Sequence, residues 1–165
     1  MFGLRVDTLG GIALDRVHRF DKEWERRASL RLRRGDVTVA EVYEANGRLH
    51  SGTLNQMERA SVAAWWERRQ AGNKGLLMSP TNEAVERLNQ RCQQTRINAG
   101  EIDTTGRHLT VGVYKVHVGE EIATRHNDRR LTTDRGEMVR NRAEWTVDHI
   151  HPDSSLTANG HNGTL

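Results

Sequence analysis

The chain of 165 residues has a formal net charge of +3, since 25 lysine and arginine residues face 22 aspartate and glutamate residues. A hydrophobic content of 35% and a charged content of 28% are typical of a polar globular chain of about one domain. The longest apolar run, residues 62–66, is too short to cross a bilayer, which takes about 20 residues. The first residues show no secretory signal, and the single cysteine, Cys92, excludes an internal disulfide. We therefore expect a cytoplasmic protein.

Nearly all of the positive charge is arginine. A guanidinium group matches phosphate oxygens in pairs, so a phosphate-binding surface is one interpretation. An arginine-rich solvated surface without a binding role is the other, and composition leaves both open.

The first part of the chain predicts helices. A short segment to about Leu14 is interrupted by two glycines, at positions 10 and 11. From Asp21, apolar residues recur every four positions and predict a helix that ends at Gly35. Asp36 can cap a second helix, which ends near residues 46–47.

Two longer helices are expected next. Thr53 can cap a helix that stops at Gly72, with at least one of its two tryptophans, Trp65 and Trp66, in the core. The apolar run 76–78 predicts a buried strand, and Thr81 or Asn82 can cap the helix that follows, up to residue 100. Helices that alternate with a buried strand predict half of a parallel α/β sheet.

The pattern changes between residues 100 and 108, where we place a domain boundary. Alternating apolar residues at 109–118, with short apolar runs at 145–150 and 155–157, predict a small antiparallel barrel. Residues 159–163 predict a hairpin turn. Only two residues follow it, so we expect a truncated gene fragment, or else a disordered natural tail.

Four runs of sequence resemble one family in the same order. They are residues 17–33, residues 43–52, residues 75–89, and residues 118–130 with 145–147. They are similar to the second motor domain of superfamily 1 DNA helicases, and above all to the helicase region of conjugative relaxases of the MobF class. The resemblance implies an α/β fold. A partial second RecA-like domain, with short parallel strands, would cover residues 1–104, and an inserted SH3-like β-barrel would cover residues 105–165.

The resemblance places a nucleotide contact before the first long helix. Arg19 would be the catalytic arginine that reaches the phosphates of ATP, and His18 would lie beside it in the same binding site. Phe20 stands where related helicases often have glutamine. The alternative is that Arg19 pairs with Glu23 or Glu25 on the adjacent helix turn.

The resemblance also implies DNA contacts. The loop 124–130 would lie against single-stranded DNA, as it does in related barrels. A solvated turn in which Asp128 neutralises one arginine is the alternative there. At the start of a helix, Thr81 and Asn82 can meet phosphate, although simple capping is favoured. Residues 139–142 depart from the family's usual asparagine-glycine turn. The predicted DNA contacts are Thr81, Asn82, Arg125, Asn127, Arg129 and Arg130.

These features predict part of an ATP-dependent helicase-relaxase of conjugative plasmid transfer. ATP and Mg²⁺ would belong to the full-length parent, and neither is expected to bind tightly to this chain. The 165 residues hold no phosphate loop, so we predict that the chain alone does not hydrolyse ATP. The expected partners are single-stranded DNA, the rest of the parent polypeptide, and a second copy of the chain through exposed edges. A stand-alone nucleic-acid-binding module and a module that contacts an acidic protein are the alternatives.

Two further features of the sequence, a pair of histidines and the single cysteine, are explained without a functional role. His149 and His151 offer too few ligands for a metal site, and a turn between strands accounts for them equally well. Cys92 lies on the apolar stripe of its helix and is interpreted as a small core residue.

Overall fold

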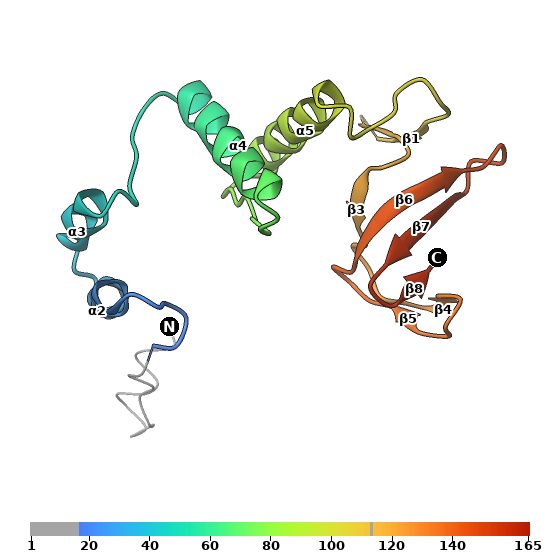
Figure 1. Cartoon of the computed structure of the whole chain (residues 1–165). Coiled ribbons are helices and arrows are strands. Elements are labelled where there is room, and N and C mark those ends of the chain that lie inside the picture. Colours follow the sequence, from blue (N-terminus) through green and yellow to red (C-terminus); the bar gives the residue numbers. More distant parts are fainter. Residues whose placement is uncertain (1–16, 113) are drawn as a thin grey trace. The chain divides into compact units, whose positions relative to one another are not determined.

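A computed structural model describes residues 17–112 and 114–165 (Figure 1). Its contacts divide the chain into two compact units, residues 1–57 and 58–165, and each unit is described by itself. The predictions for the glycine-interrupted first segment and for Val113 lie outside the described residues. Among the residues that are described, no helix is long and apolar enough to cross a membrane.

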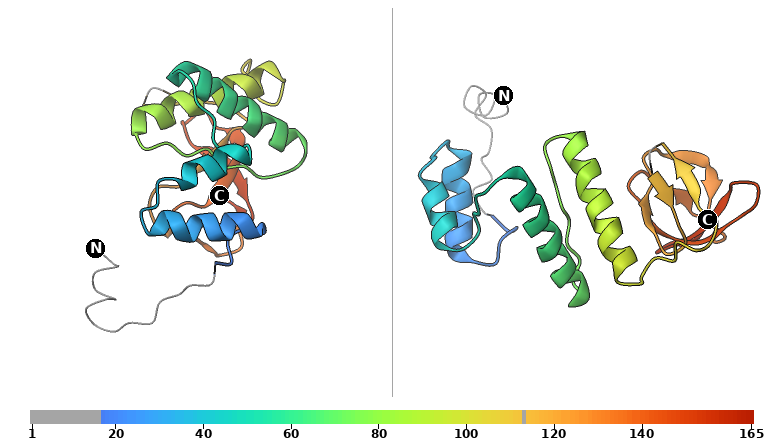
Figure 2. Two further views of the ribbon diagram at one scale, coloured as in Figure 1. Left: turned by 90° about the vertical axis from the view of Figure 1, so that its left-hand side faces the viewer. Right: turned by 90° about the horizontal axis from the view of Figure 1, so that it is seen from above.

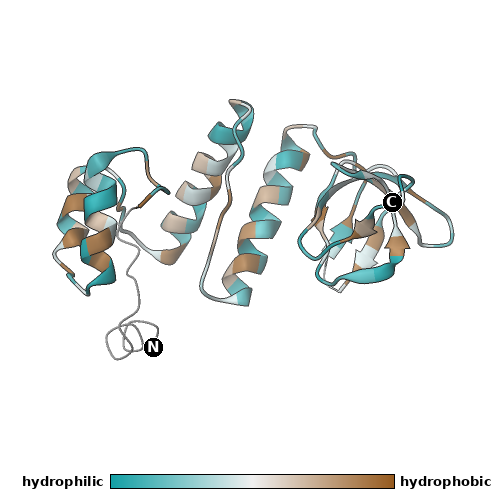
Figure 3. Cartoon of the chain, turned by 90° about the horizontal axis from the view of Figure 1, so that it is seen from below, coloured by the Kyte–Doolittle hydropathy of each residue, from teal (hydrophilic) through white to brown (hydrophobic). Residues whose placement is uncertain are grey.

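The first unit contains two short helices, α2 (Glu23–Arg33) and α3 (Val39–Ala45). Ala28 of α2 and Val39 of α3 are almost completely buried. The rings of Trp24 and Tyr43 meet edge to face, with their centroids 5.5 Å apart. Both predicted helices are thus confirmed. Figure 3 shows that each of the two helices carries both apolar and polar residues.

The two longer helices begin at the predicted caps. Before α4 (Leu54–Gln70), the Thr53 hydroxyl accepts a hydrogen bond from the Gln56 N–H at 3.4 Å. In return, Gln56 Oε1 accepts a bond from the Thr53 N–H at 2.8 Å. This reciprocal capping box satisfies two N–H groups at the helix start. Before α5 (Asn82–Asn98), the Thr81 hydroxyl accepts from the Ala84 N–H at 3.3 Å.

The prediction of a buried strand at residues 76–78 is wrong. Leu76 is 82% exposed and Met78 is 83% exposed, and the segment belongs to no strand. A parallel strand is stable only between neighbouring strands that bury both of its faces. Throughout residues 17–112 and 114–165, every strand pairs in the antiparallel sense. The short parallel strands expected beside the helices are therefore not found in the described residues.

The second unit also holds all the described strands, which Figure 2 shows close together after α5. They form three antiparallel sheets: a pair β1–β2, a pair β4–β5, and a four-stranded sheet in the order β3-β6-β7-β8. No closed barrel forms from the described strands, which corrects the barrel prediction; the fold is mixed α/β with antiparallel sheets. The strands are β1 (Leu109–Val111), β2 (Tyr114–Val116), β3 (Glu121–Ala123), β4 (Asp128–Thr132), β5 (Met138–Val139), β6 (Glu144–Ile150), β7 (Leu156–Gly160) and β8 (Gly163–Thr164).

The core of the strand region gathers around one tryptophan. Trp145 is 4% exposed and packs with Val139 and Ala158, which are buried as completely. In β6, buried and exposed residues alternate from Trp145 to Asp148, as expected for a strand with one face on a core. The predicted strand at 145–147 and the predicted turn at 159–163, which joins β7 to β8, are both confirmed.

The turn from β5 to β6 carries a strained residue. The Ala143 N–H donates to the Arg140 carbonyl at 3.2 Å and closes a four-residue turn. Arg142, the third residue, holds φ at 65°, which favours glycine. This is the position at which the sequence departs from the family's asparagine-glycine turn.

We expect Arg142→Gly to raise the free energy of unfolding by about 1 kcal/mol, because a side chain in the left-handed region costs roughly that much. Denaturant titration of the purified chain measures the change. Arg140→Gly is the matched control, since Arg140 is not among the residues with positive φ. An equal gain in both variants would show that backbone strain is not the cause.

Candidate functional site

Arg19 and His18 lie in the irregular segment that precedes α2, and both are exposed. The segment is fixed to the helix by Arg26, which donates from Nε to the Phe20 carbonyl at 2.6 Å and from Nη2 to the Asp21 carbonyl at 3.2 Å. Arg26 therefore holds the backbone next to Arg19 in a defined position.

The two carboxylates that were alternatives for Arg19 have other partners. Glu23 pairs with Arg27 at 2.9 Å, and Glu25 lies 4.0 Å from Arg48. Arg19 makes no ion pair with any residue that the structure describes. Its guanidinium group is thus available to a ligand, and its contact with nucleotide stays a prediction.

Thr81 and Asn82 open α5 and are exposed. The Thr81 hydroxyl is used as the helix cap, as the simpler interpretation holds. A contact of either residue with DNA stays a prediction.

Residues 125–142, which contain β4, β5 and the turns on either side, form one of the basic stretches of the chain. This segment holds six of the 25 basic residues and three of the 22 acidic residues, so its net charge is +3. We call residues 125–142 the basic hairpin.

The arginines of the basic hairpin differ in their pairing. Arg130 pairs with Asp128 at 3.3 Å, and hydrogen bonds from the backbone N–H and guanidinium of Arg130 lower the pKa of the Asp128 carboxyl. Arg125 and Arg129 are exposed and pair with no carboxylate of the described part of the chain. Of the three arginines predicted to contact DNA, Arg130 is therefore paired, and Arg125 and Arg129 keep their charge for a partner.

The basic hairpin is firmly attached to the sheet. Asn127 Oδ1 accepts from the Asn141 N–H at 2.8 Å, so this side chain has a structural role in addition to its predicted DNA contact. At the far end, the Thr133 hydroxyl donates to the Asn162 carbonyl at 3.1 Å. Asp134 Oδ1 accepts from the Thr164 N–H at 2.8 Å. The bond of Asn127 closes the basic hairpin itself, and the bonds of Thr133 and Asp134 connect the basic hairpin to the turn and strand that end the sheet.

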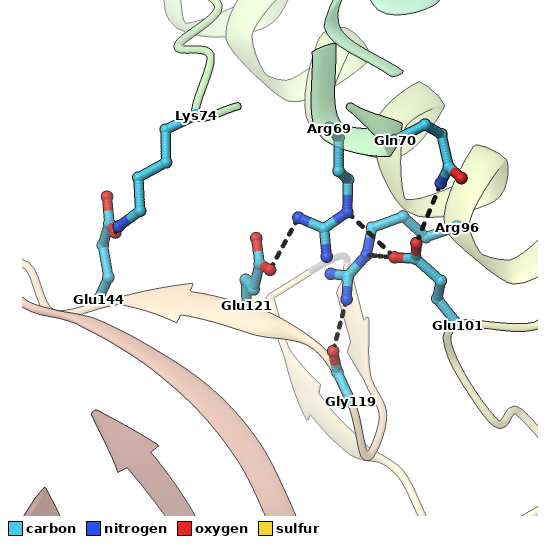
Figure 4. Close-up of polar contacts among 8 residues, drawn as sticks. All are labelled: Arg69, Gln70, Lys74, Arg96, Glu101, Gly119, Glu121 and Glu144. Carbon is cyan, nitrogen blue, oxygen red and sulfur yellow. Dashed lines mark hydrogen bonds and ion pairs between the residues drawn. The ribbon is translucent and has the colours of Figure 1, made fainter. Parts of the chain in front are cut away.

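A charged network, which the sequence did not indicate, connects α4 and α5 to the strands (Figure 4). Arg96, 7% exposed, donates from Nε to Glu101 at 3.0 Å and from Nη2 to the Gly119 carbonyl at 2.7 Å. Arg69 lies 3.1 Å from Glu101 and 2.9 Å from Glu121. Burial alone would raise the pKa of Glu101, but the bonds and charges of the two arginines outweigh it and lower that pKa.

A pocket of the second unit lies beside this network and has a volume of about 1020 Å³. Its wall includes Trp65, whose ring centroid lies 5.8 Å from the Arg69 guanidinium carbon. Its charged lining residues balance, so the pocket offers no net attraction to a polyanion. They are Arg69, Lys74, Arg142, Glu101, Glu121 and Glu144.

Cys92 is half-buried, and burial raises the pKa of its thiol to about 11. A thiol with such a pKa is protonated at neutral pH and is a poor nucleophile. The described residues contain no group of three metal-binding side chains.

Comparison with known proteins shows that the chain is similar to part of proteins of conjugal transfer. A family model described as an AAA domain matches residues 4–54, which include His18 and Arg19. The conjugal transfer protein TraA of Agrobacterium fabrum is 28% identical over 134 residues, which are 79% of this chain and 12% of that protein. The probable conjugal transfer protein TraA of Sinorhizobium fredii is 30% identical over 100 residues, which are 59% of this chain and 9% of that protein. No solved structure gives a significant match.

The chain is thus a relative of conjugal transfer proteins, and the resemblance to the helicase region of conjugative relaxases is confirmed. It spans about a tenth of the length of these relatives.

Proposed function

We propose that the chain is part of an ATP-dependent DNA helicase-relaxase of conjugative transfer, to which it contributes a nucleotide contact and a single-stranded DNA contact. Residues 1–104 would belong to its second RecA-like motor domain, and residues 105–165 to an SH3-like insertion. The parent would act in the cytoplasm, and a second copy of the chain could dock through exposed edges.

The charge of the basic hairpin carries the DNA part of the proposal. Its net charge is +3, and Arg125 and Arg129 make no ion pair with any described residue. Single-stranded DNA binds grooves and surfaces where arginine tracks the phosphate backbone. The hydrogen bond that Asn127 accepts and the one that Thr133 donates would hold these arginines on a rigid support.

Exposure and pairing support the nucleotide part. Arg19 is exposed, and Glu23 and Glu25 pair with other arginines. When bound, ATP supplies the phosphoryl group whose developing charge an arginine can stabilise. Arg19 would supply that positive charge, His18 would lie beside the same phosphates, and the ligands of Mg²⁺ would come from the rest of the parent.

We expect the purified chain to bind a fluorescent oligothymidylate in a salt-dependent way. Arg125→Ala with Arg129→Ala should lower the slope of log affinity against log salt by about 1.4, because each lost phosphate contact removes about 0.7 for a single strand. Anisotropy titrations at several salt concentrations measure the slope.

The matched control is Arg59→Ala with Arg68→Ala, which removes two exposed arginines of α4. If the control lowers the slope as much as the hairpin variant, the basic hairpin is not the contact. If no DNA binds even at low salt, the DNA proposal fails, and an acidic protein becomes the better partner.

A further inference from the structure

A second pocket of the strand region has a different charge from the first. It has a volume of about 550 Å³ and lies between the loop that leads to β1 and the turn from β6 to β7. Arg107, His108 and His151 line it, and no carboxylate does. The other lining residues are Thr105, Gly106, Ile150, Pro152 and Ser154.

We propose that this pocket binds a phosphate-type dianion through Arg107, His108 and His151. Arginine forms paired hydrogen bonds with such an anion, and protonated histidine adds charge and a further donor. Arg107 is exposed and forms no ion pair with a described residue, so its guanidinium group can reach the pocket.

Two carboxylates close in sequence to the cationic residues of this pocket accept hydrogen bonds from other residues. Asp103 Oδ1 accepts from the hydroxyl of Thr105 at 2.6 Å and from its N–H at 2.8 Å. These two hydrogen bonds lower the pKa of the Asp103 carboxyl. Asp153 Oδ1 accepts in the same way from the N–H of Ser155 at 3.0 Å. Both carboxylates thus close turns at the rim and leave the lining to cationic groups.

Each lining histidine faces a second histidine. The ring centroids of His108 and His117 are 5.5 Å apart, and those of His149 and His151 are 4.7 Å apart. His117 is 6% exposed, and its Nδ1 has no hydrogen-bond partner among the described residues.

A bound dianion would accept hydrogen bonds from ring N–H groups of His108 and His151. The other groups that face these rings are Asp103 near His117, and Asp153 and Thr157 near His151.

The position of the pocket relates it to the basic hairpin. Strand β6 leads from the turn at Arg140–Ala143 to the pocket, and seven residues at about 3.3 Å each span roughly 20 Å. A single strand of DNA with a footprint of 4 or more nucleotides, typical of small β modules, could reach both. The anion site rests on its own geometry, and only the choice of DNA as the source of the phosphate rests on the proposed function.

Sulfate is the probe, because it stays a dianion from pH 5.5 to 8. We expect sulfate to shift the ring NMR signals of His108 and His151 saturably. Arg107→Gln should weaken binding about tenfold, the typical effect of losing one charge-assisted hydrogen bond. Arg59→Gln is the matched control and should bind as the unaltered chain does.

Equal, unsaturable shifts of all histidine signals, or unchanged binding by Arg107→Gln, would overturn the anion site. Displacement of sulfate by oligothymidylate assigns the phosphate to DNA, whereas simultaneous binding assigns it to a free anion, and both support the pocket. The Arg125→Ala, Arg129→Ala variant should keep its sulfate site, so that failure of the DNA proposal and failure of the pocket can be distinguished.

Discussion

Replacing Gly163 by alanine is expected to unfold the four-stranded sheet, with a loss of about 3 kcal/mol in the free energy of unfolding. Gly163 begins β8 with φ at 123°, a conformation that residues with a side chain rarely adopt. An added Cβ would also collide with Asp134 Oδ1 and come within 3.2 Å of Thr133. Both neighbours are fixed in place, because they attach the basic hairpin to Asn162 and Thr164.

Gly136→Ala separates the two causes. Gly136 also has a positive φ, 76°, but nothing lies within 4 Å of its added Cβ. It should therefore cost only about 1 kcal/mol, the price of the conformation alone. Hydrogen exchange of the amides in β6 and β7 measures both variants. Equal losses would show that the contact with Asp134 does not hold the basic hairpin.

The helix starts and turns could be predicted because each depends on residues close in sequence. The caps at Thr53 and Thr81 are formed by N–H groups three residues away. The turn at 159–163 likewise depends on local glycine and asparagine chemistry. Such features are decided before the chain makes any distant contact, so the sequence predicts them directly.

The apolar run at 76–78 shows where the local pattern fails. Three apolar residues before a proline are typical of a buried strand, yet burial requires neighbouring strands. The described strands pair only with one another and leave Leu76 and Met78 exposed. The run favours a buried strand, but it does not indicate whether neighbouring strands are present to bury it.

The candidate sites also differ in how far the sequence predicts them. Arg125, Arg129 and Arg130 could be singled out because they follow one another closely along the chain. The network around Arg96 could not, because its members lie at positions 69, 96, 101, 119 and 121 and meet only in the folded unit. The pocket of Arg107 and His151 joins residues 44 positions apart, and nothing in either local sequence indicates the other.

Arg96→Met should lower the free energy of unfolding of the second unit by about 2–3 kcal/mol at pH 7. The methionine keeps most of the apolar volume but removes two hydrogen bonds from a site that is 7% exposed. The Gly119 carbonyl loses its buried donor, and Glu101 keeps its contacts with Arg69 and Gln70. Denaturant titration followed through the Gly119 amide, which donates to Val147, reports the loss. Arg68→Met, an exposed neighbour on α4, should change stability by less than about 0.5 kcal/mol.

The pH dependence of this loss tests its electrostatic part. Because the folded pKa of Glu101 lies below its ordinary value of 4.5, the ionised carboxylate contributes stability that is fully present above that value. The contribution disappears as the pH falls through the folded pKa. The difference between Arg96→Met and the unaltered chain should thus be constant from pH 6 to 8 and shrink below about pH 4.5. What remains in acid measures the bond to the Gly119 carbonyl alone, and a difference that stays constant down to pH 3 would assign the whole loss to that bond.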